Sequence, residues 1–326
     1  MESFFSLSPE EILDSVESAM AWDKAPKATG RVVPLNSIEN RVYDIEFEDK
    51  RESIIAKFYR PGRWTELQIL EEHEFLAKLN DAEIPVVVAE GLYAPGGKTL
   101  GKTKSGILFA LFKKVRGRSF DELNEDSLRV LGRFVARLHL VGATLKTKSR
   151  LKLDVATYGD APLEFLERSE FSKCSMFDRY WQFADELCRD IEPFFVGQKY
   201  QAVHGDCHLG NLLWHQGMPL FVDFDDFLWA PPVQDVWMIA GGRDDYAIRQ
   251  REVFLEAYEE FRDFDRATLS LIEPLRALRL IHYSAWIARR WEDPSFERMF
   301  PQFGGERWWQ EELEALSRVR ESLENS

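Results

Sequence analysis

The sequence predicts an α+β protein with a small, strand-rich lobe followed by a larger, mostly helical lobe. Three observations support this prediction. The chain has 326 residues, which suits two lobes better than one small core. Residues 32–113 contain strand-like segments around one helix, whereas the segments after about residue 115 have mainly helical spacing. We place the boundary near residues 112–116, which gives lobes of residues 1–113 and 114–326.

The composition of the chain excludes several functional classes. The net charge of −14 argues against nucleic-acid binding, which needs clustered lysines and arginines to neutralise phosphates. The three cysteines form no disulfide framework and no CxxC pair, so we expect a reducing compartment. The N-terminus lacks the pattern of a secretion signal, and no apolar run approaches the ~18–20 residues of a membrane span. We therefore expect a cytoplasmic monomer that binds neither nucleic acid nor membrane.

The small lobe is predicted to begin with a helix and to continue with strands. Ser8 is a typical N-cap residue, and Glu11 would complete a capping box with it. The strand segments, which we expect to form a five-stranded antiparallel sheet, are VVPLN, RVYDIEF, SIIAKFY, EIPVVVAEGLYA and GILFALFKKV. In the third segment Lys57 shares a face with Ile55, and we expect this face to line a cleft.

The segment TELQILEEHEFLAKLN, from about residue 65, has the apolar spacing of a helix. Glu72 falls on its apolar stripe, between Ile69 and Phe75. A carboxylate stays buried there only with a partner, because an unpaired buried charge is costly. Two interpretations remain open. Glu72 borders the stripe, which the pattern of this helix by itself favours, or it points inward and pairs with a cation.

The large lobe carries the densest group of reactive side chains. Its helical segments are residues 121–145, 175–192, 233–260 and 267–291. Between them, the possible zinc ligands in the stretch VHGDCHLGN are His204, Asp206, Cys207 and His208. Glycines favour a loop here, and no second cysteine–histidine cluster supplies a fourth ligand, so zinc is a remote alternative. A nucleophilic cysteine would need an oxyanion hole and an orienting acid, and this stretch is no nucleophile elbow.

A third interpretation of the same stretch explains more of the sequence. The order His-x-Asp-x-x-x-x-Asn, followed by another Asp, is typical of a phosphoryl-transfer catalytic loop. Here His204 and Asp206 lead to Asn211, and Asp223 ends the later segment PLFVD. One carboxylate would orient the acceptor hydroxyl, while an amide oxygen and a second carboxylate would hold Mg²⁺ on the triphosphate. The strands NLLWH and PLFVD would form a hairpin that brings Asn211 and Asp223 to one cleft.

The predicted small lobe supplies the other parts that this chemistry needs. A kinase-type site also uses a strand lysine and a helix glutamate, in that order. Lys57 and Glu72 stand in those places for independent reasons. Their pairing would explain the acid on the apolar stripe and would direct Lys57 toward the α- and β-phosphates of the nucleotide.

Several blocks of the chain resemble the aminoglycoside/choline-kinase-like phosphotransferase superfamily. HGDCHLGN and FVDFDD are similar to its catalytic and metal-binding segments, with glycine after the histidine. Other blocks, among them PLNSIENRVYDIE, KFYRPGRWTELQILEEHEF and PPVQDVWM, resemble bacterial serine/threonine protein kinases of this superfamily that act in stress responses. The similarity runs from about residue 30 to residue 310 and implies a bilobal, protein-kinase-like fold.

The resemblance implies a role for each matching residue. Asp206 corresponds to the catalytic base, and Asn211 and Asp223 correspond to the Mg²⁺ ligands. Lys57 corresponds to the phosphate-binding lysine and Glu72 to its ion-pair partner.

The nucleotide loop departs from that of ordinary kinases. Ser37 falls in this loop, which contains no glycine, so its backbone N–H groups and polar side chains would meet the phosphates. The adenine is expected near the connection FKKV, at Phe112 and Val115. Asp223 is followed by FDD, so there is no DFG motif and we do not assume activation-loop control of the usual kind.

We therefore expect an ATP- and Mg²⁺-dependent serine/threonine protein kinase that phosphorylates proteins, including itself, in a bacterial stress response. One alternative is a kinase of small alcohols such as choline, homoserine or an aminoglycoside. Another is a nucleotide-binding pseudokinase scaffold, which the glycine-free loop favours mildly and the intact set of site residues opposes.

Overall fold

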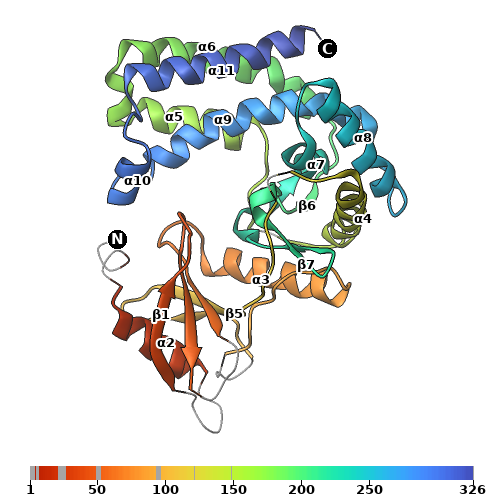
Figure 1. Ribbon diagram of the computed structural model, residues 1–326. Coiled ribbons are helices and arrows are strands. Elements are labelled where there is room, and N and C mark those ends of the chain that lie inside the picture. Colours follow the sequence, from red (N-terminus) through yellow and green to blue (C-terminus); the bar gives the residue numbers. More distant parts are fainter. Residues whose placement is uncertain are drawn as a thin grey trace. The chain divides into compact units, whose positions relative to one another are not determined.

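The computed structural model of the chain describes residues 4, 7–20, 27–48, 53–92, 97–120, 122–147 and 149–325 (Figure 1). The chain divides into two compact units. Unit 1 comprises Met1–Arg150, Asp206–Phe227 and Val253–Arg262, and unit 2 comprises Leu151–Gly205, Leu228–Glu252 and Asp263–Ser326. The lobes expected from the sequence, residues 1–113 and 114–326, stay a prediction beside this division.

A five-stranded antiparallel sheet lies within the described part of unit 1. Its strands are β1 Ala28–Pro34, β2 Arg41–Phe47, β3 Ile54–Phe58, β4 Gly101–Lys102 and β5 Leu108–Lys113. Their spatial order is β1-β2-β3-β5-β4, and each neighbouring pair is antiparallel. The expected sheet is confirmed. Lys57 lies on its central strand, β3, between Val42 of β2 and Ala110 of β5.

The prediction is wrong for one of the five strands. The segment EIPVVVAEGLYA forms isolated bridges, in which Val86 pairs with Phe221 and Ala89 pairs with Phe112. Its backbone groups are divided between two partners, so the segment does not follow a single neighbouring strand. The remaining sheet strand is β4 instead, and residues 93 and 94 of the segment lie outside the described residues.

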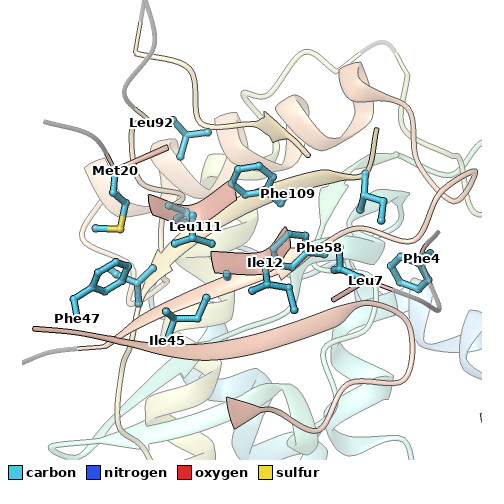
Figure 2. Packing of buried hydrophobic residues seen from close by; sticks show 14 residues of the cluster. Phe4, Leu7, Ile12, Met20, Ile45, Phe47, Phe58, Leu92, Phe109 and Leu111 are labelled. Atoms are coloured by element: carbon cyan, nitrogen blue, oxygen red, sulfur yellow. The ribbon is translucent and has the colours of Figure 1, made fainter. Parts of the chain in front are cut away.

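Helix α2, Pro9–Ala19, packs its apolar stripe against the sheet of unit 1. Figure 2 shows Ile12 of this helix in one cluster with strand residues such as Ile45 and Phe58. The Oγ of Ser8 accepts a hydrogen bond from the backbone N–H of Glu11 at 3.2 Å, as expected of an N-cap. The expected capping box is incomplete, because the carboxylate of Glu11 accepts a hydrogen bond from the backbone N–H of Ser105 at 2.9 Å.

Helix α3, Glu66–Asp81, carries an unusual buried polar run. It begins with a complete capping box between Thr65 and Gln68, so its start is fixed locally. Further along, the side chains of Glu71, Glu72 and His73 are buried beside the apolar residues of the same helix. Buried polar groups need partners, and Glu72 finds one in Lys57 of the candidate site.

The rest of unit 1 contains the segment that carries Asp206, Asn211 and Asp223. Its further elements are α4 Glu125–Gly142, η4 Leu209–Asn211, β7 Leu212–His215, β8 Met218–Phe221, η5 Phe224–Asp226 and the last part of α8 Asp245–Glu259. A Cβ atom added at Gly132 of α4 would lie 2.3 Å from the carbonyl oxygen of Phe254, so this close approach requires glycine.

Unit 2 is mainly helical, as expected for the later part of the chain. Its helices are η1 Ala156–Asp160, α5 Ala161–Glu167, η2 Glu170–Lys173, α6 Ser175–Ile191, η3 Glu192–Phe195, α7 Val233–Ala240, η6 Arg266–Leu271, α9 Ile272–Ala288, α10 Pro294–Met299 and α11 Glu306–Glu324. One small ladder pairs β6 Gln201–Val203 with β9 Leu228–Ala230. Helix α11 lies beside α6 and α9, and α5 lies beside α9 (Figure 1). None of the helices in the described ranges is long and apolar enough to cross a membrane.

The packing of α11 against α9 buries an acid. Glu312 lies mostly away from solvent, 3.4 Å from the Oγ of Ser284, and burial raises its pKa to about 7. In the unfolded chain this carboxyl group loses its proton near its ordinary pKa of 4.5, whereas the folded protein retains the proton up to about pH 7. Stability is therefore lost as the pH rises between these two values.

Glu312→Gln is expected to raise the free energy of unfolding at pH 8 by roughly 1–3 kcal/mol, because the amide avoids the cost of burying a charge. At pH 4.5 the two proteins should differ little. Urea unfolding at both pH values measures the effect, with the exposed Glu314→Gln as the matched control. Equal pH dependence in wild type and Glu312→Gln would show that Glu312 titrates normally.

Candidate active site

The segment from Asp206 to Asn211 in unit 1, which we predict to be the catalytic loop, is ordered by its own polar groups. The backbone oxygen of Asp206 accepts hydrogen bonds from the N–H of His208 and from Nδ2 of Asn211, both at 2.9 Å. The same Nδ2 lies 3.3 Å from the Asp206 carboxylate. Nε2 of His208 lies 3.4 Å from the same carboxylate. The Asp206 side chain is 24% exposed, so an external hydroxyl has access to it.

The expected hairpin is present and brings Asn211 near Asp223. Leu212 of β7 pairs with Phe221 of β8, and the N–H of Val222 donates to the carbonyl oxygen of Asn211 at 3.0 Å. Asp223 follows directly, with a left-handed backbone at φ 61° and ψ 65°. Aspartate tolerates this conformation better than most residues, and such strain is concentrated at functional sites.

Asn211 and Asp223 suit a magnesium ion that arrives with a nucleotide. The hydrogen bonds of Asn211 to Asp206 use its amide nitrogen, not its amide oxygen, and the Asp223 side chain is 54% exposed. Mg²⁺ prefers oxygen ligands and is usually completed by water and substrate phosphates. Among the described residues, no group of three or more His, Cys, Asp or Glu side chains is arranged to hold a metal ion. This donor set therefore fits a metal shared with a substrate better than a zinc site.

Lys57 of β3 is buried among three carboxylates of unit 1. Its Nζ donates to the carboxylate of Asp225 and lies 3.5 Å from Asp223 and 3.6 Å from Glu72. Burial by itself would lower the pKa of this ammonium group, but Asp225 and Glu72 outweigh burial and raise the pKa well above its ordinary value. Lys57 therefore stays protonated and presents a positive charge beside the candidate metal ligand Asp223.

Glu72 points inward, so the interpretation in which it only borders the stripe of α3 is wrong. Its side chain is 2% exposed and faces two cations, with Lys57 at 3.6 Å and Arg150 at 3.8 Å. Burial acts to raise the pKa of its carboxyl group, and the positive charges of Lys57 and Arg150 oppose this shift. The pairing with Lys57 that a kinase-type site requires is present.

Asp225 is the nearest carboxylate to Lys57, and the sequence pattern did not single it out. Its backbone lies in the short hydrogen-bonded turn η5, and its side chain is 6% exposed and also accepts from Nδ2 of Asn40. The neighbouring Asp226 pairs with Arg63. Three aspartates within four residues after a strand were the available signal, but they did not reveal which one meets the lysine.

The glycine-free loop between β1 and β2 is shaped by side chains. The Oγ of Ser37 accepts from the N–H of Asn40 at 3.3 Å, and Oδ1 of Asn40 accepts from the N–H of Arg60 at 3.1 Å. The guanidinium of Arg60 donates to the carbonyl oxygens of Glu39 at 3.0 Å and Ile38 at 3.2 Å. These contacts take the place of glycine flexibility and tie Ser37 and Asn40 to the end of β3.

The expected adenine-binding residues lie at the end of β5 and just beyond it. Phe112 pairs with Ile55 of β3, and its ring meets the ring of His73 edge-on at 6.1 Å. Burial lowers the pKa of His73 to about 3, so this imidazole is neutral. Val115 is 38% exposed. The contact of Phe112 and Val115 with adenine stays a prediction.

Two polar residues of α7 in unit 2 fix the residues that precede Asp206. The carboxylate of Asp235 accepts from the N–H of His204 at 2.9 Å and from that of Gly205 at 2.8 Å. Nε2 of Gln234 donates to the carbonyl oxygen of Gly205 at 2.7 Å. Asp235 thus has a structural task, and Cys207 is completely buried.

This fold and this arrangement of lysine, acids and amide define a phosphotransferase. The chain belongs to the family described as "Phosphotransferase enzyme family", whose model matches residues 31–272. The protein is therefore an ATP-dependent kinase.

The chain is similar over most of its length to two curated bacterial proteins. It is 39% identical to "Stress response kinase A" of Escherichia coli (strain K12) over 312 residues, which covers 94% of this chain and 90% of that protein. It is 38% identical to "Serine/threonine protein kinase RdoA" of Salmonella typhimurium over 309 residues, with 94% and 91% covered.

Solved structures with a similar fold include kinases of small molecules. A microcompartment-associated aminopropanol kinase matches with a TM-score of 0.71 at 21% identity, covering 95% of this chain and 97% of that one. Amicoumacin kinase hAmiN, solved with AMP-PNP, Ca²⁺ and Ami, matches with a TM-score of 0.69 at 21% identity, covering 88% and 89%. At this identity the likeness establishes the fold alone.

Proposed function

We propose that the chain is a Mg²⁺-dependent serine/threonine protein kinase whose active site comprises Lys57, Asp206, Asn211 and Asp223. The observation that carries this proposal is the 3.5 Å separation between Lys57 Nζ and the Asp223 carboxylate. It puts the candidate phosphate-binding cation next to the candidate metal ligand. Asn211 joins this pair to Asp206 through its hydrogen bonds within the catalytic loop.

Each residue then has a distinct task in an in-line transfer. Asp206 orients the acceptor hydroxyl and accepts its proton, as the oxygen bonds to the γ-phosphorus and the bond to the bridging oxygen of ADP breaks. Lys57 binds α- and β-phosphate oxygens, with Glu72 fixing its direction. Asn211 and Asp223 would hold the metal, which supplies charge neutralisation on the triphosphate. Ser37 and the N–H groups of its loop would cover the phosphates.

The protein acceptor is supported by the curated relatives. One of the relatives that covers 94% of this chain is named a serine/threonine protein kinase, and another is named for stress response. We therefore propose Ser/Thr hydroxyls of proteins, including this chain itself, as acceptors, and a role in bacterial stress response.

The acceptor class is tested with γ-labelled ATP and Mg²⁺. Parallel reactions contain the protein alone, the protein with a generic protein acceptor, and the protein with choline, homoserine or an aminoglycoside. Asp206→Ala serves as the inactive control in each. We expect label on protein Ser or Thr in the wild type and none in Asp206→Ala.

Two outcomes would contradict the proposal. ATP consumption only with an added small alcohol would make the chain a small-molecule kinase. Tight nucleotide binding without any transfer would make it a scaffold.

A further inference from the structure

Arg150 is a buried arginine beside the Lys57 site of unit 1. Its side chain is 0% exposed, and its guanidinium lies over the rings of Phe227 at 4.0 Å and Trp64 at 4.6 Å. Two aromatic faces attract a cation, but they do not replace the hydrogen bonds that water would accept from the guanidinium N–H groups. Because burying a charge is costly without compensation, this position needs nearby anionic partners.

The charged partners of Arg150 belong to the same site. Its Nη1 donates to the backbone oxygen of Asp225 at 2.8 Å, and its Nη2 lies 3.8 Å from Oε2 of Glu72. Among the described atoms, Nε and Nη2 of Arg150 and Oε2 of Glu72 are buried without a hydrogen-bond partner. These groups therefore have unused hydrogen-bonding capacity next to Lys57.

The backbone at Arg150 is fixed to helix α3 on its other side. Oγ of Ser149 donates to the carboxylate of Glu71 at 2.5 Å, and Nε2 of Gln68 donates to the carbonyl oxygen of Ser149 at 2.8 Å. Arg150 therefore links α3, which carries Glu72, to η5, which carries Asp225.

Two buried cations and two buried carboxylates lie together at the Lys57 site, so the charges of this group of four balance only when both cations are counted. Lys57 and Arg150 face the carboxylates of Glu72 and Asp225, and Lys57 contacts both of these acids. To bind a phosphate, the ammonium group must give up part of its contact with them. With no second cation, a buried carboxylate would then be left uncompensated, which is strongly unfavourable.

We propose that Arg150 is a positioning residue of the nucleotide site: it holds Glu72 and the Asp225 segment so that Lys57 can turn to phosphate. This inference rests on the proposed function, because it assumes that Lys57 binds the nucleotide. The competing explanation is that Arg150 only fills space between Phe227 and Trp64. Charge compensation predicts that the effect of Arg150 depends on Lys57 and Glu72, and space filling does not.

The test is a double-mutant cycle read by the affinity for Mg²⁺–ADP, measured by calorimetry. The variants are Arg150→Met, Lys57→Met, Glu72→Gln and the two pairs that include Arg150→Met. Arg150→Lys keeps the charge, and Arg129→Met removes a surface arginine that pairs with Glu256 at 3.2 Å. Thermal unfolding of every variant is measured alongside.

We expect Arg150→Met to weaken binding roughly tenfold in the wild-type background and less than about threefold in the Lys57→Met background. Arg150→Lys should restore part of the affinity, and Arg129→Met should not change it. The double variant Glu72→Gln/Arg150→Met should bind Mg²⁺–ADP more tightly than Arg150→Met alone, because Glu72→Gln removes a carboxylate that competes for Lys57. An equal loss in both backgrounds, or no recovery with Glu72→Gln, would overturn the inference.

Three further outcomes keep the inference testable and separable from the proposed function. If Arg150→Met does not fold, the affinity of Glu72→Gln for Mg²⁺–ADP is compared with that of Glu72→Gln/Arg150→Met. The double variant has lost one charge of each sign, so its affinity should be similar. A tenfold or greater difference in affinity overturns the inference. If Lys57→Met binds Mg²⁺–ADP as tightly as the wild type, the proposed nucleotide site is wrong, and the inference falls with it. If Lys57→Met weakens binding but the cycle is additive, only the inference falls.

Discussion

Asp206→Asn is expected to lower kcat for phosphoryl transfer by roughly 10²–10⁴-fold and to change the affinity for Mg²⁺–ATP by less than about threefold. The amide keeps the size of the side chain but cannot accept the proton of the acceptor hydroxyl. Affinity should be preserved because Asp206 contacts Asn211 and lies near His208, whereas the carboxylates that face Lys57 are those of Glu72, Asp223 and Asp225. Single-turnover transfer and equilibrium nucleotide binding measure the two effects.

The matched control for this change is Asp178→Asn on the exposed face of α6 in unit 2. It removes one carboxylate of the same size and should leave both kcat and affinity unchanged. A kcat for Asp206→Asn within threefold of the wild type would remove Asp206 from the chemistry. A parallel loss of nucleotide affinity would assign it to binding.

Asp223→Asn is expected to lower kcat/KM for Mg²⁺–ATP by at least about 100-fold, because it removes the charged ligand of the metal. The apparent affinity for Mg²⁺ should fall as well, so excess Mg²⁺ should restore part of the activity. Steady-state rates over a range of Mg²⁺ concentrations at fixed ATP measure both effects. An unchanged Mg²⁺ dependence would show that Asp223 is not a ligand.

The left-handed backbone of Asp223 provides the controls for that variant. Asparagine and glycine both accept φ 61°, so Asp223→Asn and Asp223→Gly should fold with little loss of stability. Alanine has a Cβ atom but no polar group that helps it tolerate the left-handed conformation, so Asp223→Ala should be destabilised by about 1–2 kcal/mol. Loss of activity in all three, with loss of stability in the alanine variant alone, would separate the metal ligand from the fold.

The sequence predicted much of the fold because its local patterns were consistent with one another. Alternation on β3 placed Lys57 on a strand, and apolar spacing put Glu72 at the stripe of α3 without deciding whether it points inward. The hairpin that carries Asn211 and Asp223 was also predictable, since two apolar runs are joined by a short glycine-containing turn. The strand expected at residues 83–94 failed, because an apolar run does not specify whether its backbone follows one partner or two.

The partners of the buried charges were not predictable from local pattern. Asp225 and Asn40 are 185 positions apart, and Arg150 is 75 positions from Asp225. A pattern identifies the face of an element on which a side chain lies, but it does not identify what the tertiary structure brings to that face. The sequence therefore identified Lys57 and Glu72 as a possible pair, and missed that Asp225 and Arg150 complete the group.

The most direct test of the central claim is the stoichiometry of transfer in one reaction. Wild-type protein is incubated with γ-labelled ATP, Mg²⁺ and a protein acceptor, and ADP formed is compared with phosphate found on Ser and Thr by mass spectrometry. The proposed kinase should transfer close to one phosphate per ADP, and Asp206→Asn should yield neither product above background. ADP formation with no phosphate on Ser or Thr, or undiminished transfer by Asp206→Asn, would contradict the account.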